Sequence, residues 1–179
     1  MFKDIKTKSD DNQEECKYNN LDPIVCGAKN RFDEFIFSTK ICKSLLGHEN
    51  WVNSIDYMIF CEKELVCSGS SDKTVRLWDV ETAKQIGIFK EHSDYVYCVK
   101  FSKFDHYHFN SNVICSSSSD KIYFYDVKYD EIKLTLDYHN GNVFSFDFSP
   151  FQGGRYLCSE SDDNTICMYD LDFKKLLYK

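Results

Sequence analysis

The sequence predicts an all-β protein built from about three copies of one four-stranded antiparallel unit. One phrase occurs three times, as VCSGSSDKTVRLWD, ICSSSSDKIYFYD and LCSESDDNTICMYD. The copies end at Asp79, Asp126 and Asp170, which sets a period of 47 and then 44 residues. Self-similarity at this period indicates a fold assembled from repeated units. The 15 phenylalanines and 12 tyrosines favour strands over helices.

The first two strands of each unit follow a histidine. The histidines are His48, His92 and His139. A valine follows each histidine by four positions, and the apolar residues seven and nine positions after it flank a polar one, as expected for a half-buried strand. The next strand carries a cysteine five residues before an aspartate, at Cys67, Cys115 and Cys158. A shared register of this kind predicts a buried free thiol, because free cysteine behaves as a small apolar side chain.

A tight turn and two further strands complete each unit. The turn contains Asp72, Asp120 or Asp163, whose short carboxylate can bond to its own backbone. The third strands are expected at 74–78, 122–125 and 165–169, and the fourth at 85–89, 132–136 and 173–178. Four strands in about 45 residues, with short turns, predict a small antiparallel sheet.

Composition excludes several classes of protein. The net charge of −7 argues against nucleic-acid and anionic-membrane partners, since both reward a basic face. No apolar run approaches the roughly 20 residues of a membrane span, and the N-terminus has no signal-peptide pattern. Nine cysteines without C-x-x-C spacing predict free thiols in a reducing compartment. We expect an intracellular protein, cytoplasmic or nuclear, without a metal or cofactor.

The unit resembles the WD repeat of β-propeller proteins, over residues 40–179. The first copy has the Gly47-His48 pair, the turn aspartate Asp72 and the closing Trp78-Asp79. The later copies have Glu91-His92 and Tyr138-His139, and tyrosine replaces tryptophan at 125 and 169. The resemblance implies a partial propeller of about three four-stranded blades.

The resemblance also implies a buried hydrogen-bonded network in each blade. Its members would be a histidine, a serine of the second strand, the turn aspartate and the closing aromatic residue. The sets are His48, Ser70, Asp72 and Trp78; His92, Ser118, Asp120 and Tyr125; and His139, Ser161, Asp163 and Tyr169. Tyrosine carries its donor further out than tryptophan and at another angle, so blade one is expected to be the most tightly locked.

A partner would bind on the rim of such a propeller, where the loops that enter the first strand meet those that enter the third. The residues at these positions are Trp51, Asn53, Ser71, Tyr95, Tyr97, Ser119, Asn142, Phe144 and Asp162. Tryptophan and tyrosine dominate binding hot spots. The leading hypothesis is therefore a noncatalytic scaffold that binds other proteins or peptides.

The sequence also bears on two other functions. An enzyme would need an unrepeated catalytic cluster, whereas the Ser/His/Asp sets recur three times without a nucleophile elbow. The His106 and His108 pair favours a polar loop over a metal site. A substrate receptor of a ubiquitin ligase often has arginine two positions after Trp-Asp, where this chain has Glu81, Lys128 and Asp172.

The chain is expected to have two parts. Residues 1–32 are polar and predict a disordered tail. Residues 33–179 form the partial propeller, with blades at approximately 47–90, 91–137 and 138–179, and residues 33–46 supply an outer strand of a preceding blade. Propellers close with about four to eight blades. We therefore expect either a fragment of a larger WD-repeat protein without independent function or self-association through open blade edges.

Overall fold

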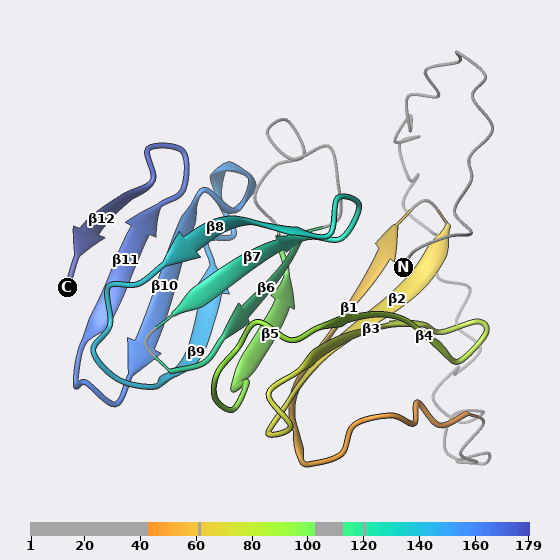
Figure 1. The fold of residues 1–179 in the computed structure, drawn as a ribbon. Coiled ribbons are helices and arrows are strands. Elements are labelled where there is room, and N and C mark those ends of the chain that lie inside the picture. The colour runs from red at the N-terminus through yellow and green to blue at the C-terminus, as the bar shows by residue number, and fades with distance from the viewer. Residues whose placement is uncertain (1–42, 61, 103–112, 120) are drawn as a thin grey trace, which may run out of the picture. The chain divides into compact units, whose positions relative to one another are not determined.

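The computed structural model describes residues 43–60, 62–102, 113–119 and 121–179. Within these residues the chain forms three four-stranded antiparallel sheets. In each sheet every strand is bonded to its neighbour in the sequence, so the orders are β1-β2-β3-β4, β5-β6-β7-β8 and β9-β10-β11-β12 (Figure 1). The predicted all-β fold with three blades is confirmed.

The strands lie close to their predicted positions. The first sheet contains β1 (Val52–Phe60), β2 (Lys63–Ser70), β3 (Val75–Asp79) and β4 (Lys84–Phe89). The second contains β5 (Cys98–Phe101), β6 (Val113–Ser117), β7 (Ile122–Asp126) and β8 (Glu131–Leu136). The third contains β9 (Val143–Phe148), β10 (Tyr156–Ser161), β11 (Ile166–Asp170) and β12 (Lys175–Tyr178), with a 3-10 turn, η1 (Gln152–Gly154), before β10.

The turn between the third and fourth strands has the same backbone geometry in every sheet. Ala83, Asp130 and Lys174 occupy it with φ of 55°, 54° and 49°. Positive φ is uncommon for residues other than glycine. Its recurrence in three unrelated side chains shows that the backbone path of the repeat, and not one local residue, determines this turn.

Two apolar layers hold neighbouring sheets together. Leu65, Cys67, Val75 and Leu77 of the first sheet pack against the second sheet, on side chains such as Val99. Phe124 of the second sheet packs in the same way against the third, on Phe146, Phe148 and Leu157. Burial of apolar area in these layers stabilises the fold by roughly 25 cal/mol per Å².

The described cysteines are free thiols, as predicted. They are Cys67, Cys98, Cys115, Cys158 and Cys167. Cys67 and Cys115 are fully buried, and burial raises the pKa of both thiols. A raised pKa leaves little thiolate, so these two side chains fill space and have little reactivity.

Some predictions fall outside the described residues. They concern the tail at 1–32, most of the strand expected at 33–46, the histidines His106 and His108, and the turn aspartate Asp120. Residues 43–46 are described and do not lie in a strand. Across the described ranges, no helix is long and apolar enough to span a membrane, and no group of three potential metal ligands occurs.

Candidate functional site

The network in the first sheet is complete, but its serine is Ser68. Trp78 Nε1 donates to Ser68 Oγ at 2.8 Å, and Ser68 Oγ lies 2.7 Å from His48 Nε2. His48 Nδ1 lies 2.8 Å from Asp72 Oδ2. The serine accepts from the indole and donates to Nε2, so the imidazole proton on Nδ1 points at the carboxylate. The network joins β2, β3, the turn between them and the loop before β1.

The predicted Ser70 is therefore wrong as the network serine. Ser68 and Ser70 are two residues apart and lie on the same face of β2, about 6.6 Å apart along the strand. β2 pairs with β3 through Val66 and Trp78, which places Ser68 beside the indole and Ser70 near the turn. Ser70 Oγ accepts instead from the backbone N–H of Asp72 at 3.0 Å. Ser70 supports the turn and does not contact Trp78.

The third sheet has the same arrangement, with the same correction. His139 Nε2 lies 2.8 Å from Ser159 Oγ, and His139 Nδ1 lies 3.1 Å from Asp163 Oδ2. The hydroxyls of Ser159 and Tyr169 are 3.2 Å apart, so the tyrosine reaches the serine. The predicted Ser161 instead accepts from the backbone N–H of Asp163 at 3.1 Å.

The second sheet departs from this pattern. His92 Nε2 lies 2.6 Å from Ser116 Oγ, so Ser116 replaces the predicted Ser118. The hydroxyl of Ser118 is buried and has no hydrogen-bond partner among the described residues. The phenol of Tyr125 donates to Glu91 at 2.9 Å and not to the serine. The turn aspartate of this blade, Asp120, lies outside the described residues.

The residue before each histidine differs with the closing aromatic residue: it is glycine beside tryptophan and a larger residue beside tyrosine. A Cβ on Gly47 would lie 3.0 Å from Trp78 Cη2 and would displace the guanidinium of Arg76, so a side chain at this position would crowd the indole. The smaller tyrosines leave room there. Glu91 accepts from Tyr125 in blade two, and Tyr138 packs on Tyr169 in blade three with ring centroids 5.6 Å apart. The paired exchange of Gly and Trp is present in the sequence, but the sequence alone does not show that the two residues are in contact.

Hydrogen bonds lower the pKa values of the network aspartates, and burial lowers the pKa of one network histidine. Burial disfavours the charged form of Asp72, but hydrogen bonds from Thr74, the Glu49 N–H and His48 hold the pKa of the carboxyl well below its ordinary value. Bonds from Thr165 and the Asn140 N–H likewise lower the pKa of Asp163. Burial lowers the pKa of His92 to about 4. The imidazole of blade two is therefore neutral at pH 7.

The first part of the predicted rim is held together by polar contacts. Asn53 Nδ2 donates to Ser71 Oγ at 3.0 Å and to the Val96 carbonyl at 2.9 Å. The backbone N–H of Ser71 donates to the Trp51 carbonyl at 2.8 Å. Asn53 and Ser71 thus join the first blade to the start of the second. The Trp51 side chain is 80% exposed, so its indole remains accessible.

An aromatic row continues the rim across blades two and three. Tyr95 and Tyr97 meet edge to face with centroids 6.5 Å apart, and Tyr97 meets Phe144 in the same manner at 5.0 Å. Tyr95 is 45% exposed and Phe144 is 46% exposed, whereas Tyr97 is half-buried between them. Residues separated by almost 50 positions in the chain thus form one row of rings.

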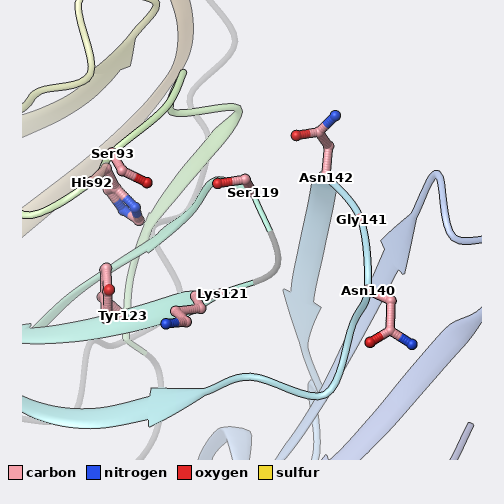
Figure 2. A pocket seen from close by; sticks show the side chains of 8 residues that line it. All are labelled: His92, Ser93, Ser119, Lys121, Tyr123, Asn140, Gly141 and Asn142. Atoms are coloured by element: carbon pink, nitrogen blue, oxygen red, sulfur yellow. The ribbon is translucent and has the colours of Figure 1, made fainter.

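A polar pocket of about 380 Å³ lies on the rim where blades two and three meet. Figure 2 shows His92 and Tyr123 on one side and the loop of Asn140–Asn142 on the other. Ser119 pairs with Asn142 through an isolated β-bridge, and Asn142 Nδ2 donates to Asp162 Oδ2 at 2.8 Å. The second half of the predicted rim is thus also in mutual contact.

Two carboxylates lie near the middle ring of the aromatic row. The pKa of Tyr97 is raised, first by burial and then by the carboxylates of Asp94 and Asp162. The two carboxylates therefore place negative potential beside the rings. An aromatic face with a negative surround favours a cationic side chain over an anionic one.

Two family models match the chain. Residues 48–126 match the TEP-1 C-terminal β-propeller. Residues 131–170 match the WD domain, G-beta repeat. The two matched ranges cover β1 to β11 and leave β12 outside.

Curated proteins with the same repeats are identical to this chain at about three residues in ten. Protein SPA1-RELATED 4 of Arabidopsis thaliana is 31% identical over 125 residues, which covers 69% of this chain and 15% of that protein. Protein SPA1-RELATED 3 of the same plant is 30% identical over 150 residues, covering 80% and 17%. The human DDB1- and CUL4-associated factor 5 is 30% identical over 136 residues, covering 72% and 13%. The chain thus spans less than a fifth of the length of these relatives.

Proposed function

The chain belongs to the WD-repeat β-propeller family, and from this membership we propose that it is a noncatalytic module that binds a protein segment on its rim. The aromatic row of Tyr95, Tyr97 and Phe144 carries the proposal. It combines accessible ring surface with a fixed geometry, which are the properties of binding hot spots. Trp51 adds a fourth ring, which is 80% exposed. Its backbone carbonyl accepts from the N–H of Ser71.

The chemistry of the rim favours a segment that carries lysine or arginine. Asp94 and Asp162 lie close enough to Tyr97 to raise the pKa of its phenol. A cation placed over one of the exposed rings would gain both the attraction of the π face and that of the carboxylates. A neutral or acidic segment would gain neither.

The arrangement of the polar sets supports a role without catalysis. Ser68 is buried between His48 and Trp78, and Ser159 is buried between His139 and Tyr169. A serine nucleophile needs an exposed hydroxyl beside an oxyanion hole. The hydroxyls of these serines are instead occupied by the closing aromatic residues.

A peptide selection tests the proposal. Random peptides displayed on phage are selected on the full chain, and the enriched peptides are labelled for fluorescence anisotropy. We expect enrichment of lysine and arginine. We also expect Tyr95→Ala to weaken binding by about tenfold or more, since a hot-spot side chain contributes upwards of about 1.4 kcal/mol.

The control is Phe151→Ala, which removes a ring that is 75% exposed and lies outside the rim, between β9 and β10. The affinity of this variant for the selected peptides should equal that of the wild type. Peptides that bind both variants and wild type equally would show that the rim is not the binding surface. Enrichment of acidic peptides would contradict the electrostatic part of the proposal.

A second function, substrate receptor of a ubiquitin ligase, is favoured by one relative. The name of that relative, DDB1- and CUL4-associated factor 5, associates it with DDB1 and CUL4. The positions two residues after each closing aspartate, Glu81, Lys128 and Asp172, lack arginine. Purified DDB1 mixed with the full chain should co-elute in size exclusion under this alternative, and separate elution would exclude direct binding.

A further inference from the structure

The side chain of Asp162 differs from those at the same place in the other two blades. The residue before the turn aspartate is serine in blades one and two, at Ser71 and Ser119, and aspartate in blade three, at Asp162. The backbone is alike, because the N–H of Asp162 donates to the Asn142 carbonyl at 3.1 Å, as that of Ser71 does to Trp51 at 2.8 Å. Blade three therefore adds a negative charge at a rim position where the other blades have a neutral hydroxyl.

Two neighbouring residues fix the direction of the Asp162 carboxylate. Asn142 Nδ2 donates to Asp162 Oδ2 at 2.8 Å. A Cβ on Gly141 would overlap with Asp162 Oδ1, so the glycine leaves the room that this oxygen occupies. The φ of Gly141 is not positive, so its backbone conformation is open to other residues. The close approach of the carboxylate is what requires glycine at this position.

The Asp162 carboxylate is exposed, and no lysine or arginine among the described residues forms an ion pair with it. Two other aspartates of the same blade do have a cation. Lys179 Nζ lies 3.5 Å from Asp163 Oδ2, and Arg155 pairs with Asp170. Asp162 thus presents a fixed carboxylate that a cation of a bound segment can pair with.

The aromatic row has a carboxylate near each end, and the two carboxylates differ in accessibility. Asp94 precedes Tyr95, is half-buried and accepts from the Tyr95 backbone N–H at 2.8 Å. Asp162 is bonded to Asn142, which precedes Phe144 by two residues. After burial, both carboxylates raise the pKa of the middle tyrosine of the row, Asp94 more than Asp162. Asp94 is nevertheless directed at its own loop, whereas Asp162 faces solvent.

The surroundings of the two Asp162 oxygens favour an ammonium over a guanidinium. Oδ2 already accepts from Asn142, and Oδ1 lies against Gly141. A guanidinium binds a carboxylate best through two parallel hydrogen bonds, one to each oxygen. An ammonium is a compact point charge that needs one accessible lone pair. An incoming lysine therefore fits this carboxylate better than an incoming arginine.

We propose that Asp162 is the residue by which the rim recognises a lysine of the bound segment, with Asn142 and Gly141 as positioning residues. This inference rests on the peptide-binding function proposed above, and it narrows the partner from any cationic segment to one that carries lysine where it meets blade three. The methylene stem of that lysine would lie on Phe144, whose ring is 46% exposed, while its ammonium pairs with Asp162.

Fluorescence anisotropy with three forms of one peptide tests the inference in the full chain. The probe is the most enriched lysine-containing peptide of the phage selection, compared with forms in which each lysine in turn is replaced by methionine or by arginine. At one lysine, the wild type should bind the lysine form about fivefold more tightly than the methionine form, the upper value for an exposed ion pair. The arginine form should bind more weakly than the lysine form. Asp162→Asn keeps an acceptor for Asn142 without the charge, so the lysine preference should fall to about one.

Gly141→Ala tests the positioning of the carboxylate without a change of charge. Its methyl group would displace Asp162 Oδ1, so the lysine preference should fall as it does in Asp162→Asn. The double variant should show no further loss, because Gly141 acts through Asp162. A purely structural role of Gly141 would lower the stability in urea and leave the lysine preference intact, which would contradict the positioning role.

The control is Asp130→Asn, which removes one negative charge from an exposed residue in the turn between β7 and β8, outside the rim, and should keep the wild-type preference. Asp94→Asn should reduce the preference less than Asp162→Asn does, and the reverse order would overturn the inference.

The failure of this inference and the failure of the rim function give different results. If Tyr95→Ala weakens binding while Asp162→Asn keeps the lysine preference, the rim function stands and the role of Asp162 is wrong. A wild type that prefers the arginine form, or a selection without lysine peptides, would also overturn that role. Equal binding by Tyr95→Ala and wild type would overturn the rim function itself. Circular dichroism verifies that each variant is folded.

Discussion

The indole N–H of Trp78 donates a 2.8 Å hydrogen bond to the hydroxyl of Ser68, and both side chains are almost completely buried. The same hydroxyl contacts His48, which in turn contacts the turn aspartate Asp72. Each of these four side chains is hydrogen-bonded to the next one. Loss of one member therefore leaves a buried polar group without its partner, which costs more than the bond itself contributes.

We expect Trp78→Phe to lower the free energy of unfolding by about 1–3 kcal/mol, because Ser68 loses its donor and the smaller ring leaves space. Equilibrium unfolding in urea measures the difference. Trp51→Phe is the matched control, since Trp51 is 80% exposed and should change stability by less than about 0.5 kcal/mol. Equal stability of Trp78→Phe and wild type would contradict the network.

A double-mutant cycle distinguishes Ser68 from Ser70. Ser68→Ala and Trp78→Phe should be coupled by roughly 0.5–3 kcal/mol, because the two side chains share a hydrogen bond. Ser70→Ala should combine with Trp78→Phe almost additively, since Ser70 bonds to the Asp72 backbone. The reverse result would restore the serine expected from the sequence.

The free energy of unfolding should decrease as the pH is lowered, because His92 has a lower pKa in the folded protein than in the unfolded chain. An unfolded imidazole binds a proton near pH 6.5, whereas burial lowers the pKa of folded His92 to about 4. The unfolded chain therefore holds more protons between these values, and the free energy of unfolding decreases as the pH drops through that window. The full difference is about 3 kcal/mol, at about 1.4 kcal/mol per pKa unit.

His92→Gln removes the titrating group and should flatten the profile between pH 6.5 and 4.5, as measured by urea unfolding at each pH. Its absolute stability will also change, since Gln does not reproduce the bond to Ser116. The slope is therefore the diagnostic quantity. A variant whose slope equals that of the wild type would show that other groups cause the dependence.

Cysteine labelling should follow burial. Cys67 and Cys115 are fully buried and have a raised pKa, so iodoacetamide should modify them much more slowly than Cys158, which is partly buried. Peptide mass spectrometry after a timed reaction measures the rates. Urea should equalise them. Rapid native labelling of Cys115 would show that the layer between the second and third sheets opens often.

The repeat made most of the fold predictable, and the details of the networks less so. Alternation after each histidine and the aspartate turns located all three sheets, because they are local patterns. The predicted network serine lies two residues after the actual one because the run SGSSD offers several hydroxyls on the same face. Pairing the strands outward from the turn, with Val75 opposite Gly69, would have placed Ser68 beside Trp78.

Other features depend on contacts that no local pattern contains. Tyr97 and Phe144 meet only because the sheets of blades two and three pack face to face. The bond from Tyr125 to Glu91 depends on space that the exchange of tryptophan for tyrosine leaves. The sequence contains one sign that blade two differs. The distance from the turn aspartate to the closing aspartate Asp126 is one residue shorter than the distances to Asp79 and Asp170. Blade two thus lacks the position of Thr74 and Thr165.

The chain-order topology of the sheets has a consequence for cooperativity. Each sheet consists of consecutive strands, so it can form without waiting for distant parts of the chain. Stability then accumulates as a sum over sheets and over the layers between neighbours, as in other linear arrays. Among the described residues, the sheet of β5–β8 has an apolar layer on both sides, whereas the other two sheets each have one. Opening should thus begin at the ends, and amide hydrogens in the middle sheet should exchange last.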